Sequence, residues 1–149
     1  MREALHDALK EAMKAQDKCA VATIRLILAA LKEKDIAARG SDASEAGDAD
    51  ILAIMQTMVK QRHDSIAMYE KGNRPELARQ ERDEIAIIER FLPRQLCDAE
   101  IESAVDSAIE ETGAEGLKFM GKVMAALRER YAGQMDFAKA GAIAKQRLS

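Results

Sequence analysis

The stretch Arg90-Phe91-Leu92-Pro93-Arg94-Gln95-Leu96 decides how this chain is organised. Pro93 has no amide hydrogen and disfavours a helical conformation at the residue before it, so a helix is predicted to end at about Leu92. Apolar side chains on both sides of the break, Phe91, Leu92 and Leu96, favour a packed joint over a loose tether. The break itself does not tell whether it separates two units with different functions.

The composition around this break is typical of a helical protein. Of the 149 residues, 48% are apolar, 33% are charged and only 3% are aromatic. Strong helix formers dominate, and only two prolines and eight glycines interrupt them. The sequence predicts an all-α fold, in one domain or two small ones, that is large enough to bury a core.

Net charge and cysteine content limit the functional classes. The net charge of −3 gives no global basicity of the kind that indicates nucleic acid or membrane binding. The first residues lead into a charged helix rather than a secretory signal, and no apolar run approaches the length of a membrane span. Two cysteines make no disulfide framework, so Cys19 and Cys97 are interpreted as small apolar residues. The sequence therefore predicts a cytoplasmic protein and suggests no cofactor.

Four helices are predicted before the break, in an N-terminal domain of residues 1–95. Apolar residues at helical spacing predict an antiparallel pair over residues 2–16 and about 18–39. Asp17 is the predicted N-cap of the second helix, and the small polar stretch 40–47 is a predicted exposed loop. The third helix is predicted to begin at a cap, Asp48 or Asp50, and to run to about Lys71; the fourth runs from Pro75 to about Leu92.

Two charged residues interrupt the apolar stripes of the third and fourth helices. Arg62 lies ten residues before Gly72 and Glu81 lies nine residues after it, so a hairpin at this glycine would bring the two side chains together. A structural ion pair that fixes the register of the hairpin is favoured over a ligand site.

Three shorter helices are predicted after the break, in a C-terminal domain of residues 96–149. Asp98 is the predicted cap of the first helix and Gly113 its end, Gly133 ends the second, and Asp136 caps the last. Each helix carries an apolar stripe, as in a small three-helix bundle.

No residue pattern predicts catalysis. The run His63-Asp64-Ser65 resembles a triad only as text, because residues two apart on a helix point to nearly opposite sides and cannot act as base and nucleophile. His6 and His63 are the only histidines, and no cluster of His, Cys and Asp has the spacing of metal ligands. The sequence predicts no catalytic residue and no metal site.

Charge is distributed unevenly after the break. Residues 98–115 hold seven acids and no base, whereas residues 116–149 hold seven bases and two acids. Either the acidic and basic helices partly neutralise one another, or the basic helices present a phosphate-binding surface. The candidate residues of such a surface are Lys118, Gly121, Lys122, Lys139, Lys145 and Arg147.

Gly121 is a candidate because glycine inside a helix costs about 0.5–1 kcal/mol relative to alanine, so something is expected to lie close to it. A neighbouring helix is the favoured neighbour. A nucleic-acid backbone, reached beside Lys122, is the alternative.

Five motifs together resemble the YqeY family, the stand-alone members of the GatB/YqeY superfamily. They are Thr23-Ile24-Arg25-Leu26, Lys60-Gln61-Arg62-His63-Asp64-Ser65, Tyr69-Glu70-Lys71-Gly72-Asn73-Arg74-Pro75-Glu76-Leu77, Leu92-Pro93-Arg94-Gln95-Leu96 and Met120-Gly121-Lys122-Val123-Met124. The resemblance implies a C-terminal domain similar to the tail of the GatB component of the tRNA-dependent amidotransferase. That enzyme forms the amide on a mischarged tRNA with glutamine as nitrogen donor, and its tail helps to hold the tRNA.

The function that this resemblance implies is that of a tRNA-binding accessory protein, not itself catalytic, although family labels carry a carbon–nitrogen ligase activity. One departure concerns the stretch before the last helix, where the amidotransferase tail often has a basic residue and this chain has Gly133-Gln134-Met135-Asp136-Phe137. Lys139 and Lys145 are the expected substitutes. The alternative function is a helical adaptor without a nucleic-acid role, whose grooves and acidic helix over residues 98–112 dock a partner protein.

Overall fold

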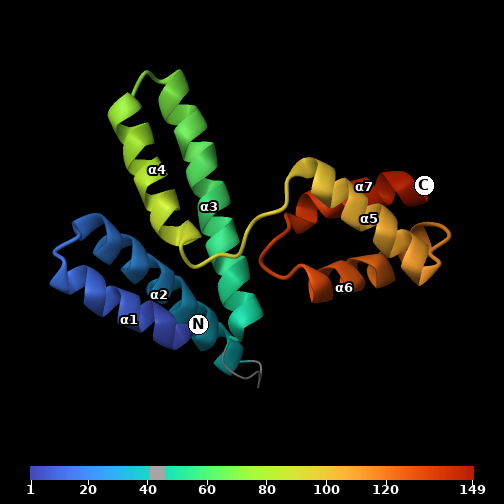
Figure 1. The fold of residues 1–149 in the computed structure, drawn as a ribbon, viewed down its shortest axis with the longest axis horizontal. Helices are drawn as coiled ribbons and strands as arrows, with labels where there is room; N and C mark the ends of the chain where they lie inside the picture. The colour runs from blue at the N-terminus through green and yellow to red at the C-terminus, as the bar shows by residue number, and fades with distance from the viewer. Residues whose placement is uncertain (41–45) are drawn as a thin grey trace. The chain divides into compact units, whose positions relative to one another are not determined.

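Helices make up most of the computed structural model, which describes residues 1–40 and 46–149 (Figure 1). No strand occurs among these residues, so the predicted all-α class is confirmed. Contacts divide the chain into a first unit, residues 1–92, and a second unit, residues 93–149. The assignment of two domains with a boundary at residues 95 and 96 stays a prediction. The elements are α1 (Arg2–Lys14), α2 (Lys18–Arg39), α3 (Asp48–Lys71), α4 (Pro75–Glu89), α5 (Asp98–Thr112), the 3₁₀ turn η1 (Leu117–Phe119), α6 (Met120–Arg130) and α7 (Phe137–Leu148).

Several predicted helix ends are confirmed by their capping contacts. The Asp17 carboxylate accepts a hydrogen bond from the Ala20 amide at 3.0 Å and so begins α2. The Asp136 carboxylate does the same for the first amides of α7, and Pro75 lies in the first turn of α4. Gly113 ends α5 with φ of +64°, a conformation that favours glycine.

Other ends differ from the prediction. Helix α4 stops at Glu89, and the Phe91 and Leu92 amides donate to the carbonyls three residues back, so the chain tightens before Pro93. Asp98 is not the cap of α5, because Cys97 precedes the helix and the Glu100 carboxylate accepts from its amide at 3.1 Å.

The start of α3 and the start of α6 also differ in detail. Gly47 precedes α3, and its amide donates to the Asp50 carboxylate at 3.1 Å. Helix α6 begins at Met120, after a 3₁₀ turn that covers the first residues of the predicted helix. Residues 41–45 of the predicted loop lie outside the described residues.

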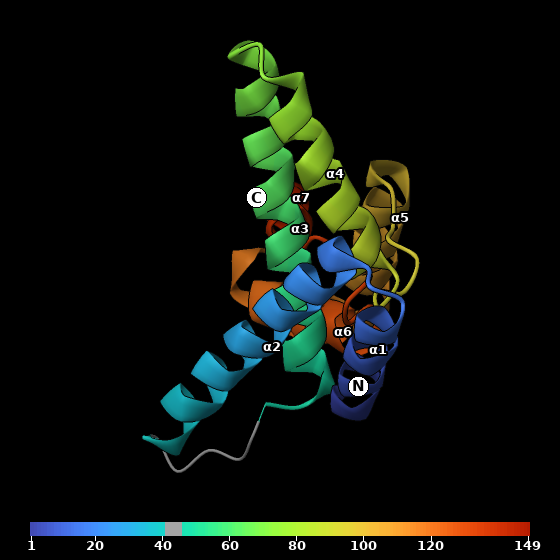
Figure 2. The same ribbon diagram turned by 90° about the vertical axis from the view of Figure 1, so that its left-hand side faces the viewer.

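The first unit consists of the α1–α2 pair and the α3–α4 hairpin, and the tip of the hairpin extends away from that pair (Figures 1 and 2). Apolar stripes of all four helices meet in its core, because each helix has one apolar face to remove from water. Its largest fully buried apolar side chains are Leu5, Ile27, Ile51, Met55 and Ile88.

In the second unit, residues 94–96 before α5 are held by hydrogen bonds to other parts of the unit. The Leu96 amide donates to the Gln134 carbonyl at 2.8 Å, and the Gln95 side chain donates to the Gly133 carbonyl at 2.6 Å. Arg94 makes a bidentate pair with Glu100 at 3.0 and 2.7 Å. These bonds join the segment after Pro93 to α5 and to the loop before α7, around a core that includes Val105, Val123, Leu127, Met135 and Ala140.

A set of hydrogen bonds, which we call the clamp, joins Arg2 of α1, Asp35 of α2 and Ala46, which precedes α3. The Arg2 guanidinium donates to both oxygens of Asp35, at 2.9 and 2.8 Å, and to the Ala46 carbonyl at 2.9 Å. The Asp35 carboxylate also accepts from the Ala46 amide at 3.0 Å. The Arg2 hydrogen bonds, with help from that amide, lower the pKa of Asp35 from 3.8 to about 2.

This clamp predicts a specific acid sensitivity. Because the folded pKa of Asp35 lies below the unfolded one, its contribution is complete above about pH 4 and is lost as the pH falls through about 2. Asp35→Asn is therefore expected to flatten the pH dependence of the free energy of unfolding between pH 4 and 2, measured by urea titration. Asp64→Asn removes an exposed carboxylate as the control. Parallel curves for wild type and Asp35→Asn would show that the clamp does not couple to folding.

Candidate nucleic-acid interface

Two of the candidate cations are paired with the acidic helix α5. Lys139 Nζ lies 3.1 Å from Asp98, and Arg147 Nε lies 3.1 Å from Asp106. Partners eight residues apart on α7 meet partners eight residues apart on α5, so the two helices run in the same direction. The hydrogen bond that Lys139 donates to the Asp98 carboxylate raises the pKa of Lys139. The interpretation in which acidic and basic helices neutralise one another therefore holds for this face of the second unit.

The start of α6 carries two lysines that, unlike Lys139 and Arg147, have no carboxylate partner among the described residues. Lys118 lies in η1 and Lys122 in the first turn of α6, and both are exposed. Lys118 Nζ lies 5.2 Å from the centre of the Phe119 ring, and no carboxylate of the described residues lies within ion-pair distance of either lysine. No side chain caps the helix at Phe119 among those residues. The dipole of α6 adds partial positive charge at this end to that of the two lysines, and the Met120 amide itself donates to the Leu117 carbonyl of η1.

Lys145 of α7 is directed toward this same end of the second unit. A Cβ atom on Gly141 would lie 3.8 Å from the Met120 side chain and 3.9 Å from that of Met124, so the middle of α7 packs against the start of α6. Lys145 is exposed and lies one turn beyond Gly141 on the same side of α7. We call Lys118, Gly121, Lys122 and Lys145 the α6 cluster.

Gly121 has open space where a side chain would lie. A Cβ atom built at this position meets no described atom within 4 Å. The expectation that a neighbouring helix lies against Gly121 is therefore wrong for the described part of the chain. The alternative, close approach by a nucleic-acid backbone, stays a prediction.

Arg62 lies between α3 and α4 with two carboxylates rather than one. Its Nε atom is 3.0 Å from Glu84 and 4.0 Å from Glu81, and its Nη1 donates to the Met58 carbonyl at 3.2 Å. All three charged side chains are largely withdrawn from water. The sequence pattern did not single out Glu84 as a partner of Arg62, although Glu84 follows Glu81 by three residues and so lies on the same side of α4.

Further properties of the described residues concern the requirements of a metal site, a reactive thiol and a membrane-spanning helix. Within residues 1–40 and 46–149, no three His, Cys, Asp or Glu side chains are arranged to hold a metal ion. Burial raises the pKa of the Cys19 thiol, which disfavours its nucleophilic thiolate form. No helix that the structure describes has the length and apolar character needed to cross a membrane.

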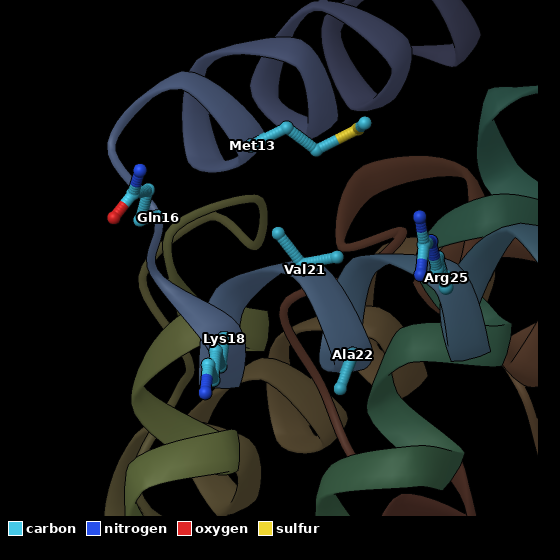
Figure 3. Close-up of a pocket in the computed structure, with 6 residues that line it drawn as sticks. All are labelled: Met13, Gln16, Lys18, Val21, Ala22 and Arg25. Carbon is cyan, nitrogen blue, oxygen red and sulfur yellow. The ribbon is translucent and has the colours of Figure 1, made fainter.

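A shallow groove marks the junction of α1 and α2 in the first unit. Met13 of α1 lies across the groove from Val21 of α2, and Lys18 and Arg25 flank Val21 along α2 (Figure 3). Gln16 and Ala22 complete the lining. No sequence pattern singles out this groove, because it depends on how the two helices pack.

Comparison with known proteins covers nearly the whole chain. A family model described as "Yqey-like protein" matches residues 2–148. Among curated proteins, "Altered inheritance of mitochondria protein 41, mitochondrial" of Lachancea thermotolerans is 36% identical over 105 residues, which are 69% of this chain and 54% of that protein. The protein of the same name from Vanderwaltozyma polyspora is 32% identical over 74% of this chain and 61% of its own length. The chain thus spans little more than half the length of these relatives.

The names of these relatives correct one prediction. Each is named as a mitochondrial protein, including the one from Kluyveromyces lactis. The predicted cytoplasmic location is therefore wrong. The prediction rested on the lack of a secretory signal, of an apolar membrane span and of a disulfide framework, and none of these distinguishes the cytoplasm from mitochondria.

Proposed function

The chain belongs to the Yqey-like protein family, as its five motifs indicated, and from this premise we propose that it is a non-catalytic accessory protein that binds tRNA through the α6 cluster. The proposal includes the link to tRNA-dependent amidotransferase that the family resemblance implies. The relatives' names say nothing of either activity, so the proposal rests on the charges of the second unit.

The observation that supports the proposal is the contrast between two sets of cations. Lys139 and Arg147 are paired with carboxylates of α5, whereas Lys118, Lys122 and Lys145 have no such partner among the described residues. A lysine without an internal partner can contact a phosphate without first breaking an ion pair. Solvent-exposed ion pairs are weak, so Lys139 and Arg147 can still exchange their partners for phosphate.

The open space at Gly121 is the second feature that supports a phosphate contact at the α6 cluster. The Met120 amide at the start of α6 already donates to the Leu117 carbonyl of η1, so Gly121 would contribute by letting a phosphate come close to the backbone, where a side chain would hold it away. Lys118 and Lys122 would flank such a phosphate from the turn before and from the helix itself. The cluster therefore combines long cationic side chains with accessible backbone, the two means by which proteins hold phosphates without reading sequence.

No catalytic step is assigned to the chain. His63 and Ser65 lie in α3 two residues apart, a spacing that directs their side chains to different sides of the helix. Among the described residues, no three His, Cys, Asp or Glu side chains are arranged to hold a metal ion that could activate a nucleophile. The carbon–nitrogen ligase label is thus proposed to reflect association with an amidotransferase rather than activity of this chain.

The test is a titration of labelled tRNA at several salt concentrations with three proteins. Wild type is compared with Lys118→Ala/Lys122→Ala, and with Lys10→Ala/Lys71→Ala, which removes two exposed lysines of the first unit. Removal of two phosphate contacts is expected to weaken binding and to reduce the slope of log K against log salt by roughly 1.4–1.8, while the control keeps the wild-type slope. Absence of binding at low salt, or equal slopes for all three proteins, would refute the proposal.

Gly121→Ala separates stability from binding within the same experiment. The substitution is expected to stabilise the second unit by about 0.5–1 kcal/mol, because alanine favours the helix and meets no neighbour. It is expected to weaken tRNA binding if a phosphate contacts this backbone. A more stable protein with unchanged affinity would remove Gly121 from the interface.

A further inference from the structure

The outward face of α2 carries a regular pattern of basic and apolar residues that does not contribute to the core of the first unit. Every seventh residue is a cation, and midway between successive cations lies an alanine or isoleucine. All of these side chains are exposed. They form a stripe with alternating spacings of four and three residues, which we call the α2 seam: Lys18, Ala22, Arg25, Ala29, Lys32, Ile36 and Arg39.

The opposite face of α2 accounts for the fold of the first unit. Ala20, Ile24, Ile27 and Leu31 are buried against the other helices. They precede or follow the seam positions by two residues, a rotation of about 200° that places the seam on the far side of the helix. The seam therefore has no partner within the described residues of the first unit.

Large apolar side chains in and beside the seam are exposed. Leu26 is 49% exposed, Ile36 is 56% exposed, and Met13 of α1 is 52% exposed at the groove of Figure 3. The groove begins the seam, since Lys18, Ala22 and Arg25 belong to both. Its volume of about 490 Å³ leaves room for side chains of a docked segment.

We propose that the α2 seam docks an acidic amphipathic helix of a partner protein. A stripe with spacings of four and three is the contact line of helices that pack side by side. Alanines at positions 22 and 29 permit close approach of a second helix, and the cations recur about every 10.5 Å, which is the spacing of acids on a helix with one Asp or Glu in each heptad.

The positive charge of the α2 seam favours an acidic partner helix over a basic partner or a lipid surface. Lys18, Arg25 and Lys32 have no ion-pair partner among the described residues, and Glu33 is the acid that borders the middle of the seam. A basic partner would be repelled at every second turn. A lipid surface is less suited, because two of the three positions between the cations are alanines, which insert little apolar volume.

The probe is a labelled helical peptide with Leu at the seam-facing apolar positions and Glu every seventh residue. Its binding to the full chain is measured by fluorescence anisotropy at physiological salt. Saturable binding is expected, and Lys18→Glu/Arg25→Glu/Lys32→Glu is expected to weaken it by about tenfold or more. The matched control Lys10→Glu/Lys71→Glu/Arg79→Glu reverses three exposed cations elsewhere in the first unit and is expected to bind like wild type. Thermal melts confirm that both variants fold.

A charge swap makes the test specific. The Lys18→Glu/Arg25→Glu/Lys32→Glu variant should bind a second peptide in which each Glu is replaced by Lys, and wild type should not. The proposal is refuted if a scrambled peptide of equal charge binds wild type as well as the probe does. It is also refuted if vesicles with anionic lipid bind the seam and the peptide does not, or if sedimentation shows a dimer that the seam variant abolishes. None of these results depends on tRNA binding, which uses residues of the second unit.

Discussion

Replacing Arg62 by methionine is expected to destabilise the first unit by about 3–5 kcal/mol. The side chains of Arg62, Glu84 and Glu81 are only 12%, 17% and 21% exposed, so water screens their charges little. Without the guanidinium, two carboxylates remain between α3 and α4 with no opposite charge. Methionine preserves most of the packing of the arginine stem, so the loss reports the charge rather than a cavity.

The partner that matters most is expected to be Glu84. It accepts from Arg62 Nε at 3.0 Å, whereas Glu81 lies at 4.0 Å. Arg62→Met/Glu84→Leu is therefore expected to recover much of the stability lost by the single variant, and Arg62→Met/Glu81→Leu less of it. Urea unfolding followed by circular dichroism measures all four proteins.

A control lies on the same pair of helices. Arg82 of α4 pairs with Glu70 of α3, but both side chains are more than half exposed. Arg82→Met is expected to change stability by no more than about 1 kcal/mol, because exposed pairs contribute little. A further loss of stability in both Arg62 double variants, or a loss in Arg62→Met no larger than that of Arg82→Met, would show that the buried charges do not act as one unit.

Replacing Leu127 by alanine is expected to cost about 2–5 kcal/mol and to affect the second unit alone. Leu127 is fully buried in the core shared by α5, α6 and α7. The second unit has 57 residues (93 through 149), for which a stability of roughly 3–9 kcal/mol is typical. A cavity of this size would therefore remove a large share of its stability.

Hydrogen exchange resolved by segment measures where the loss appears. Amides of α5–α7 are expected to exchange faster in Leu127→Ala, while those of α1–α4 keep the wild-type rates. Leu117→Ala, which truncates an exposed leucine of η1, is the control. Faster exchange spread evenly over α1–α7 would mean that the chain unfolds as one cooperative domain, and the predicted two-domain division would be wrong.

Local signals predicted the positions of the helices well because they act over a few residues. Asp17, Pro75, Gly113 and Asp136 each mark a helix end through a neighbouring amide or a backbone conformation, so no distant part of the chain is needed to interpret them. Asp98 was misassigned because Glu100, held by Arg94, supplies the cap instead.

The candidate interface was predicted less completely because charge pairing depends on which helix faces meet. The sequence showed acids in α5 and bases in α7, but not that Asp98 and Asp106 would pair with Lys139 and Arg147. Likewise the hairpin at Gly72 indicated an acidic partner for Arg62, and Glu84 proved to be nearer than Glu81. A rotation of either helix by a fraction of a turn would select other partners.

The amino-acid order alone was enough to establish an all-helical chain, a break at Pro93 and membership of the Yqey-like family, since composition, capping residues and motifs are properties of short segments. The packing of the helices was needed to learn which cations are neutralised, that Gly121 faces open space, and that the other described residues of the first unit leave the α2 seam uncovered. These features arise from contacts between segments far apart in the chain, where side-chain reach and helix orientation, rather than spacing along the sequence, select the partners.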